Sequence, residues 1–169
     1  MEKDLVVDLE GKVKFPEANV VYCGERDGAI SYLMDNGGKG YAIVYSTLTG
    51  GNRSTLTGGD YSTLTGGNRS TLTGGNRSTL TGGDYSTLTG GNRSTLTGGD
   101  YSTLTGGDYS TLTGGDYSTL TGGEKATLIF KRWNGKRYKF YIAYVGEDGI
   151  KESTAYRLNT AGEFEECTE

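Results

Sequence analysis

The chain has 169 residues, of which 30 are glycine and 33% are apolar, so it is about one domain long but too poor in apolar side chains for a broad core. Its net charge of -4 divides into -3 for residues 1–44, -1 for residues 45–123 and 0 for the remainder, with no cluster of Lys and Arg, which disfavours nucleic-acid binding through phosphates. The sequence shows no apolar run of about 18 residues and no leader-like segment, so we expect a soluble chain without a membrane span or export signal, and we assign no compartment.

Residues 1–44 are predicted to form a β-rich N-terminal cap. Short runs of strand-forming residues alternate there with turn residues, and the expected strands cover residues 5–9, 12–15, 19–23, 29–34 and 41–44. A stacked rod of strands exposes unpaired backbone groups at its end, and a cap would cover them. A partner-binding head is the alternative, although we recognise no motif for it.

Residues 45–123 contain ten nearly identical octapeptides of the form Tyr/Arg-Ser-Thr-Leu-Thr-Gly-Gly-Asn/Asp, a period that indicates a repeat architecture. The alternation in Ser-Thr-Leu-Thr predicts a half-buried strand, and the Gly-Gly-Asn/Asp that follows predicts a turn, because these residues tolerate positive φ. Because Tyr or Arg at the first position is too large and polar for a thin interior, the first, third and fifth positions must face outward. Ser and Leu therefore point inward, and both threonines point outward.

The number of octapeptides per coil decides which residues stack. Two per coil would form one internal stripe from Leu48, Leu64, Leu80, Leu96 and Leu112 and a facing stripe from Leu56, Leu72, Leu88, Leu104 and Leu120. Three per coil would instead stack Tyr61, Tyr85 and Tyr109. We favour two, so the predicted fold class is all-β: a β-solenoid (parallel β-helix) of about five 16-residue coils with β-rich N- and C-terminal caps.

The outward threonines are the candidate functional residues. In the two-octapeptide coil they form two flat arrays, whose hydroxyl groups recur at about 6.6–6.8 Å within a strand and about 4.8 Å along the rod. The first array comprises Thr47, Thr49, Thr63, Thr65, Thr79, Thr81, Thr95, Thr97, Thr111 and Thr113. The second comprises Thr55, Thr57, Thr71, Thr73, Thr87, Thr89, Thr103, Thr105, Thr119 and Thr121. Such a lattice can order water; alternatively, Thr serves only as a good strand former on a solvated face.

The first and last positions of the octapeptide vary together. Within the repeats Asn precedes Arg and Asp precedes Tyr, so neighbouring corners can pair Arg with Asp or stack Arg on Tyr. The candidate assembly residues are Tyr45, Tyr61, Tyr85, Tyr101, Tyr109, Tyr117, Arg53, Arg69, Arg77 and Arg93. Duplication of two DNA cassettes would produce this pattern without any function, whereas an edge rich in Tyr and Arg could also dock onto another rod.

Residues 124–160 are predicted to form a C-terminal cap with a hairpin turn at Asn134-Gly135. The expected strands cover residues 127–133, 136–145 and 150–158. Alternation in the second strand gives one aromatic-rich face, which consists of Tyr138, Phe140, Ile142 and Tyr144. We expect this face to cover the open end of the solenoid as a roof. Residues 161–169 should form a loose acidic tail whose deletion costs little stability.

Several chemistries lack the residues that they need. The sequence has no His, and Cys23 and Cys167 lie on opposite sides of the repeats, so we expect no metal, no cofactor, and either two free thiols or an intermolecular bridge. Calcium-binding β-rolls use nine-residue repeats with a different placement of Gly and Asp. Spaced Asp and Arg on a convex rod form no catalytic cleft, so we expect no enzyme. A disordered Gly/Ser/Thr linker is a further alternative, against which the strict alternation argues.

The repeats resemble the repeat domain of bacterial ice nucleation proteins, whose sixteen-residue coils pair two Ala-Gly-x-x-Ser-x-Leu-Thr-like halves. The family's short C-terminal cap resembles Thr127-Leu128-Ile129-Phe130, Trp133-x-Gly135-Lys136-Arg137-Tyr138, Ala143 and Gly146-x-x-Gly149-Ile150. Together the two stretches cover about residues 45–150. The resemblance implies a β-solenoid whose Thr-x-Thr rows organise ice-like water, a ladder formed by the six repeat tyrosines, side-by-side assembly, and a match between the four repeat arginines and the family's arginine-bearing coils.

The chain departs from that family in several ways. The family's membrane-associated N-terminal domain has no counterpart, the Ala-Gly turn is Gly-Gly, both faces carry Thr-Leu-Thr, about five coils replace dozens, and the arginine octapeptides are interspersed. A short relative or an engineered chain fits these departures. We expect an ice-binding or ice-nucleating template whose partners are ice or ordered water and other copies of the chain, with no nucleic acid and no membrane. The alternative is a purely structural, self-assembling solenoid without ice activity.

Overall fold

The computed structural model describes residues 7–9, 12–14 and 45–167. The chain divides into two compact units, Met1–Gly40 and Tyr41–Glu169. In the first unit, β1 (Val7–Leu9) pairs antiparallel with β2 (Lys12–Lys14), within the first two strands predicted for the N-terminal cap. The other strands predicted there, the role of the cap and Cys23 lie outside the described residues.

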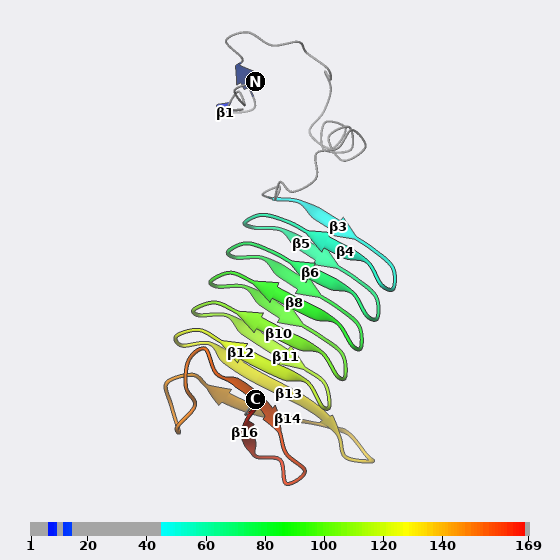
Figure 1. Cartoon of the computed structure of the whole chain (residues 1–169), viewed down its shortest axis with the longest axis vertical. Coiled ribbons are helices and arrows are strands. Elements are labelled where there is room, and N and C mark those ends of the chain that lie inside the picture. The colour runs from blue at the N-terminus through cyan, green and yellow to red at the C-terminus, as the bar shows by residue number, and fades with distance from the viewer. Residues whose placement is uncertain (1–6, 10–11, 15–44, 168–169) are drawn as a thin grey trace. The chain divides into compact units, whose positions relative to one another are not determined.

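The second unit is a β-solenoid built of two sheets, in which the strands of the repeats pair in parallel (Figure 1). The first sheet contains β3 (Thr47–Thr49), β5 (Thr63–Thr65), β7 (Thr79–Thr81), β9 (Thr95–Thr97) and β11 (Thr111–Gly114). The second contains β4 (Thr55–Thr57), β6 (Thr71–Thr73), β8 (Thr87–Gly90), β10 (Thr103–Gly106) and β12 (Thr119–Gly122). Neighbouring strands pair in register at an offset of 16 residues, so each coil holds two octapeptides, as predicted. The coil of three octapeptides is excluded.

Leucine forms the interior of the solenoid, and the predicted inward and outward positions are confirmed. Leu72, Leu88 and Leu104 stack in register within the second sheet and are 0% exposed. Leu48 and Leu56, in the first coil, are only partly buried. Because each coil contributes only one leucine from either sheet, the core is long and thin, and its stability depends on neighbouring coils rather than on any one of them.

Serine accompanies leucine in the interior because every coil supplies its hydroxyl group with partners. The Ser86 Oγ accepts a hydrogen bond from the backbone N–H of Ser70 at 3.3 Å and donates one to the carbonyl of Gly67 at 3.2 Å. The same two bonds recur along the rod. Among the described residues, no buried side-chain nitrogen or oxygen atom lacks a hydrogen-bond partner. A polar interior is therefore tolerated, since the cost of burying a hydroxyl group is offset by its bonds.

The corners differ from the sequence-based expectation. Positive φ falls on the Tyr or Arg that opens each octapeptide, with φ of 58° at Tyr85 and 59° at Arg93, and on no repeat glycine. The ladder holds these residues in that region: the N–H of Tyr85 donates to the carbonyl of Asp100 in the next coil at 2.8 Å. Such a conformation costs about 1–3 kcal/mol and persists only where the surroundings determine it.

The two glycines are needed for space. A Cβ atom built on Gly82 would lie 2.8 Å from the Ser86 Cβ atom, and one built on Gly83 would lie 2.0 Å from Asn68 Oδ1. Equivalent contacts occur at most later corners, whereas Gly51, in the first coil, has nothing within 4 Å. Gly-Gly therefore allows the inward serine and the corner of the preceding coil to approach the backbone closely.

Replacing Gly83 with Ala should lower the free energy of unfolding by about 1–3 kcal/mol, since the added methyl group overlaps Asn68 and the backbone beneath it. Gly51→Ala is the matched control: it makes the same chemical change at the same octapeptide position, but into open space. Urea unfolding followed by circular dichroism measures both variants. Similar losses for the two would show that glycine acts through conformation alone rather than through packing.

Each sheet ends in antiparallel pairing at the C-terminal end of the solenoid. In the first sheet, β13 (Thr127–Trp133) adds parallel to β11, and β14 (Tyr138–Tyr144) returns antiparallel to β13 after Asn134-Gly135. In the second, β15 (Ala155–Leu158) pairs antiparallel with β12, and β16 (Phe164–Glu166) pairs antiparallel with β15. The third cap strand was predicted at residues 150–158, but the observed strand, β15, begins only at Ala155.

The prediction that the aromatic face of β14 roofs the solenoid is wrong. Its four residues lie outward and are between 51% and 60% exposed, because the register places Ile142 opposite Ile129 on the outer face of the first sheet. The open end is covered instead by a cluster of inward residues, namely Phe130, Val145, Tyr156 and Leu158.

The expectation of a loose tail is also wrong for the residues that form β16. Phe164 packs against the core and meets the Phe130 ring edge-on, with centroids 5.4 Å apart. This contact is not predictable from the sequence, because one apolar residue among several Glu residues is a weak strand signal. Cys167, directly after β16, is a half-buried free thiol.

Candidate functional site

The outward threonines form the two arrays predicted by the 16-residue coil. We call the outer surface of β3, β5, β7, β9 and β11 the first threonine face, and that of β4, β6, β8, β10 and β12 the second threonine face. Parallel pairing aligns threonine with threonine throughout both faces, as in Thr63 with Thr79 and Thr71 with Thr87. Every coil therefore presents the same Thr-Leu-Thr row.

Most of these threonines are exposed, but the last row of each face is not. Thr111, Thr113, Thr119 and Thr121 are only half-buried rather than open to water. Their neighbours in the cap explain the difference, because Thr113 pairs with Ile129 and Thr121 pairs with Ala155. The accessible part of each array is consequently shorter than the run of repeats.

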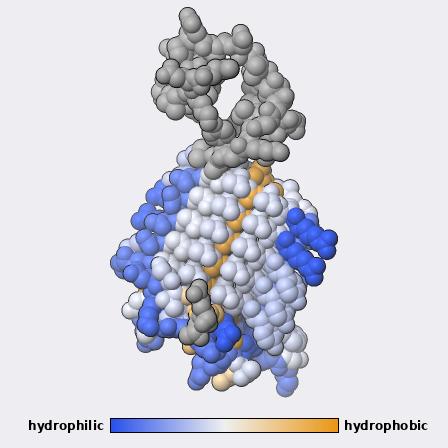
Figure 2. All heavy atoms as spheres, viewed as in Figure 1, coloured by the Kyte–Doolittle hydropathy of each residue, from blue (hydrophilic) through white to orange (hydrophobic). Residues whose placement is uncertain are grey.

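The exposed surface is regular because the backbone is regular. Figure 2 shows pale columns, the hydropathy colour of threonine, serine and glycine, on either side of an orange column of leucine residues, with blue side chains at the margins. Tyrosine rings stacked on successive coils lie 4.9 Å apart between centroids, which reports the rise per coil. Hydroxyl and methyl groups thus recur at two fixed spacings, about 4.8 Å along the rod and about 6.6–6.8 Å across it.

The corner residues form two mixed edges rather than one tyrosine ladder. The first edge, which precedes the strands of the first sheet, consists of Tyr45, Tyr61, Arg77, Arg93, Tyr109 and Lys125. The second edge, which precedes those of the second sheet, consists of Arg53, Arg69, Tyr85, Tyr101 and Tyr117. All of the candidate assembly residues are exposed, but the interspersed order of the octapeptides divides the tyrosines between opposite sides of the coil.

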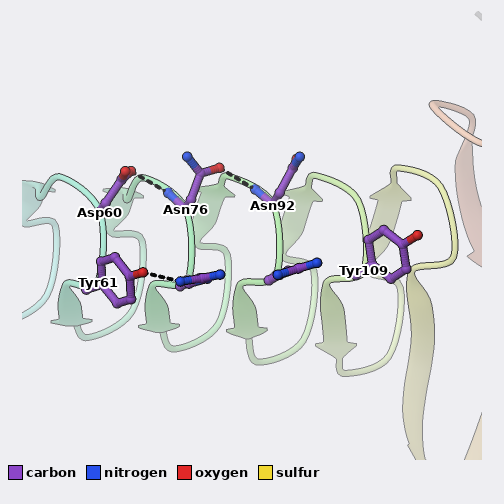
Figure 3. A pocket seen from close by; sticks show the side chains of 7 residues that line it. Asp60, Tyr61, Asn76, Asn92 and Tyr109 are labelled. Atoms are coloured by element: carbon purple, nitrogen blue, oxygen red, sulfur yellow. Dashed lines mark hydrogen bonds between the residues drawn. The ribbon is translucent and has the colours of Figure 1, made fainter.

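Arginine stacks on tyrosine within each edge. The Arg69 guanidinium carbon lies 5.6 Å from the Tyr85 ring centroid, and that of Arg77 lies 5.3 Å from the centroid of Tyr61. Arg77 also donates a hydrogen bond to the Tyr61 hydroxyl group (Figure 3). Of the two pairings that the sequence allowed, the edges therefore use cation–π stacking. Among the described residues, no ion pair joins a repeat Arg to a repeat Asp.

A second ladder, which sequence reasoning missed, runs beside the tyrosines and arginines. The N–H of Asn76 donates to Asp60 Oδ1 at 2.7 Å, and the N–H of Asn92 donates to Asn76 Oδ1 at 2.9 Å, as the row of side chains in Figure 3 shows. Asn and Asp are interchangeable here because both present Oδ1 as the acceptor. The signal was the restriction of this position to Asn or Asp, which we had assigned to turn preference.

The edges also change the pKa of two groups. The pKa of the Tyr101 phenol is raised above 10.0, first because its place in the stack removes water from it and then because Tyr117 and Tyr85 disfavour its anion. The pKa of the Lys125 ammonium is raised, first by a hydrogen bond with Glu124 and then by one to the Tyr109 hydroxyl group at 3.2 Å. At neutral pH the Tyr101 phenol is therefore neutral and the Lys125 ammonium is charged.

Arg132 joins the end of the solenoid to the C-terminal cap. Its Nε donates to Asp116 Oδ1 at 2.7 Å, while its two terminal nitrogens donate to the carbonyls of Asn159 and Leu158 at 2.8 and 3.1 Å. Within the ladder, each Asn or Asp Oδ1 accepts a hydrogen bond from the backbone N–H of the residue 16 positions later, as Asp100 does from Asp116. Arg132 lies 16 residues after Asp116 but donates to it through its side chain instead. The guanidinium group therefore terminates the ladder of Asn and Asp side chains.

Comparisons of this chain with protein-family models, with curated proteins and with solved structures found no match. Within the described ranges no helix is long and apolar enough to cross a membrane, and no group of three or more His, Cys, Asp or Glu residues could hold a metal ion. Within the repeats, the threonine faces and the two edges are the exposed surfaces that recur from coil to coil.

Proposed function

We propose that this protein binds ice or templates its formation through the two threonine faces, and that its potency grows when rods assemble. The observation that carries the proposal is the unbroken register of Thr-Leu-Thr rows, which repeats a hydroxyl and methyl group at fixed spacings on a rigid backbone. A lattice of this kind can hold water molecules in an ordered layer. The sequence resemblance to bacterial ice nucleation proteins supports the same function.

The size of one rod limits what it can do alone. Five coils span about 24 Å at about 4.8 Å per coil, and the last row of each face is half-buried. A small template stabilises only a small ice nucleus, so a single rod should bind ice better than it nucleates it. Side-by-side or end-to-end association would enlarge the template. The exposed Tyr and Arg edges are consistent with such association, since these residue types are enriched in interfaces.

Lysine substitutions on one face at a time test the proposal. The first-face variant replaces Thr63, Thr65, Thr95 and Thr97 with Lys, and the second-face variant replaces Thr71, Thr73, Thr103 and Thr105. All of these side chains are exposed, and the changed coils alternate, so that no two lysines stack directly on neighbouring strands. The two variants carry the same charge and the same number of changes, and each is the matched control of the other.

We expect at least one variant to lose partition into growing ice and to freeze droplets at the buffer background temperature, because long charged side chains disrupt the ordered layer. Circular dichroism should report an unchanged fold. A loss in only one variant would assign the activity to that face. If a variant that combines all eight changes still partitions and freezes as the parent chain does, the threonine faces have no role in ice, and the structural solenoid becomes the better account.

A further inference from the structure

The strand β14 has one free edge. The N–H of Val145 donates to the carbonyl of Ala126, and the carbonyl of Arg137 accepts from the N–H of Asn134, so odd-numbered residues direct their backbone groups toward β13. Because antiparallel bonding alternates, the backbone N–H and C=O groups of the even-numbered residues point away from β13. Among the described strands, none pairs with this side of β14.

The even-numbered residues of β14 also carry an exposed apolar stripe. Tyr138, Phe140, Ile142 and Tyr144 are 52%, 60%, 51% and 51% exposed, and Trp133 extends the stripe across β13. These side chains lie on the same surface as the first threonine face, since Tyr144 pairs with Thr127, which continues the column of Thr111. A long apolar strand with unpaired backbone groups is a template on which another chain can add.

We propose that β14 of one copy pairs antiparallel with β14 of a second copy about a two-fold axis at Tyr141. In this register Tyr138 faces Tyr144 of the second copy, and Phe140 faces its Ile142. Both pairs are formed by residues with free backbone groups, so each can exchange N–H···O=C bonds in the manner of a hydrogen-bonded antiparallel pair. Aromatic and aliphatic side chains meet on one face, which stabilises such cross-strand pairs.

The charges at the two ends of β14 favour this direction. Lys136 and Arg137 precede the strand, Glu147 and Asp148 follow it, and all four are exposed. None of them takes part in an ion pair among the described residues. Antiparallel pairing brings the basic turn of each copy against the acidic turn of the other, whereas parallel pairing would bring like charges together. The surface is therefore self-complementary, as a two-fold interface requires.

The resulting dimer is an end-to-end extension of the first sheet. The two-fold axis is perpendicular to that sheet, so the first threonine faces of both copies lie on one side, separated only by β13 and β14 of each copy. A continuous sheet of this kind would hold two threonine lattices in a common orientation. The dimer does not depend on ice binding, and it forms through the cap rather than through the Tyr and Arg edges of the repeats.

The mass of the full chain in solution tests the proposal. Light scattering after size exclusion should give twice the 18.0 kDa mass of the chain, and Phe140→Asp should return the mass to that of one chain. Tyr101→Asp, which changes an exposed aromatic side chain on the second edge, should leave the dimer intact. A monomeric parent chain, or a dimer that is lost on changing Tyr101 but not Phe140, overturns the proposal.

Charge reversal in the two turns provides a test that does not touch the apolar stripe. Lys136→Glu and Glu147→Lys should each raise the dimer Kd by about tenfold at low salt, because like charges then oppose each other. An equimolar mixture of the two variants should recover the parent affinity, since both junctions of the heterodimer regain opposite charges. Circular dichroism checks the fold of each variant. A mixture no tighter than the single variants contradicts the antiparallel arrangement.

Discussion

Replacing Leu88 with Ala should lower the stability of the solenoid by about 2–5 kcal/mol, the largest effect expected of any single repeat position. Leu88 is 0% exposed and stacks in register between Leu72 and Leu104. Each coil has only one leucine from either sheet, so no other side chain of that coil can move into the cavity. The loss should approach the sum of the transfer and cavity costs.

Leu48→Ala is the matched control for this change. Leu48 occupies the same octapeptide position but is only partly buried in the first coil, so its truncation removes less apolar contact and leaves no closed cavity. Amide hydrogen exchange is the appropriate measurement, because a repeat array can open locally without unfolding as a whole. We expect faster exchange in the strands next to Leu88. Equal effects at both positions would mean that the leucine stripe does not carry the stability of the rod.

Replacing Arg132 with Met should lower the stability of the C-terminal cap by about 2–3 kcal/mol. The change keeps the apolar stem of the side chain but removes every donor to Asp116, Leu158 and Asn159. Arg132 and Asp116 are only 20% and 26% exposed at their side chains, so water replaces these bonds incompletely. Lys should restore only part of the loss, since one ammonium group cannot reproduce the planar fork that reaches three acceptors.

Arg157→Met is the control for the Arg132 prediction. Arg157 pairs with Glu165 at 3.3 Å, but these side chains are 55% and 48% exposed, and such surface pairs contribute about 0–1 kcal/mol. Urea unfolding gives the difference in stability, and limited proteolysis should cleave the cap faster when Arg132 is absent. If the two arginine variants lose the same stability, Arg132 does not act as the link between the solenoid and its cap.

The repeat unit itself was predictable from local chemistry. Alternation in Ser-Thr-Leu-Thr, together with the size of Tyr and Arg, was enough to place serine and leucine inside and threonine outside. The cap strand at residues 127–133 was likewise predicted, and β14 (Tyr138–Tyr144) lies within the strand predicted at residues 136–145, because bulky β formers flank an Asn-Gly turn. These features depend on residues close in sequence, so the sequence carries them directly.

The failures share a physical cause. The Gly-Gly-Asn/Asp turn was expected to tolerate positive φ, but positive φ lies on the residue after it, such as Tyr85, because the ladder from coil to coil sets the corner and the glycines are required for close packing. The aromatic face of β14 was expected to roof the core, but its direction is set by the register with β13. Phe164 was expected in a loose tail, but its ring contacts the Phe130 ring at the end of the solenoid.

By itself, therefore, the sequence determined the period, the alternation and the outward direction of the threonines, since these follow from side-chain parity within a single octapeptide, whereas the 16-residue register of the strands decided that the threonines form two arrays. The tertiary structure decided how the tyrosines divide between two edges, how Asn and Asp form a ladder, where Arg132 ends it, and which face of β14 meets water. The two edges, the ladder and the contacts of Arg132 join atoms 16 or more residues apart that come together only when coils stack, whereas the outward face of β14 depends on its register with β13 and on the addition of β13 to β11.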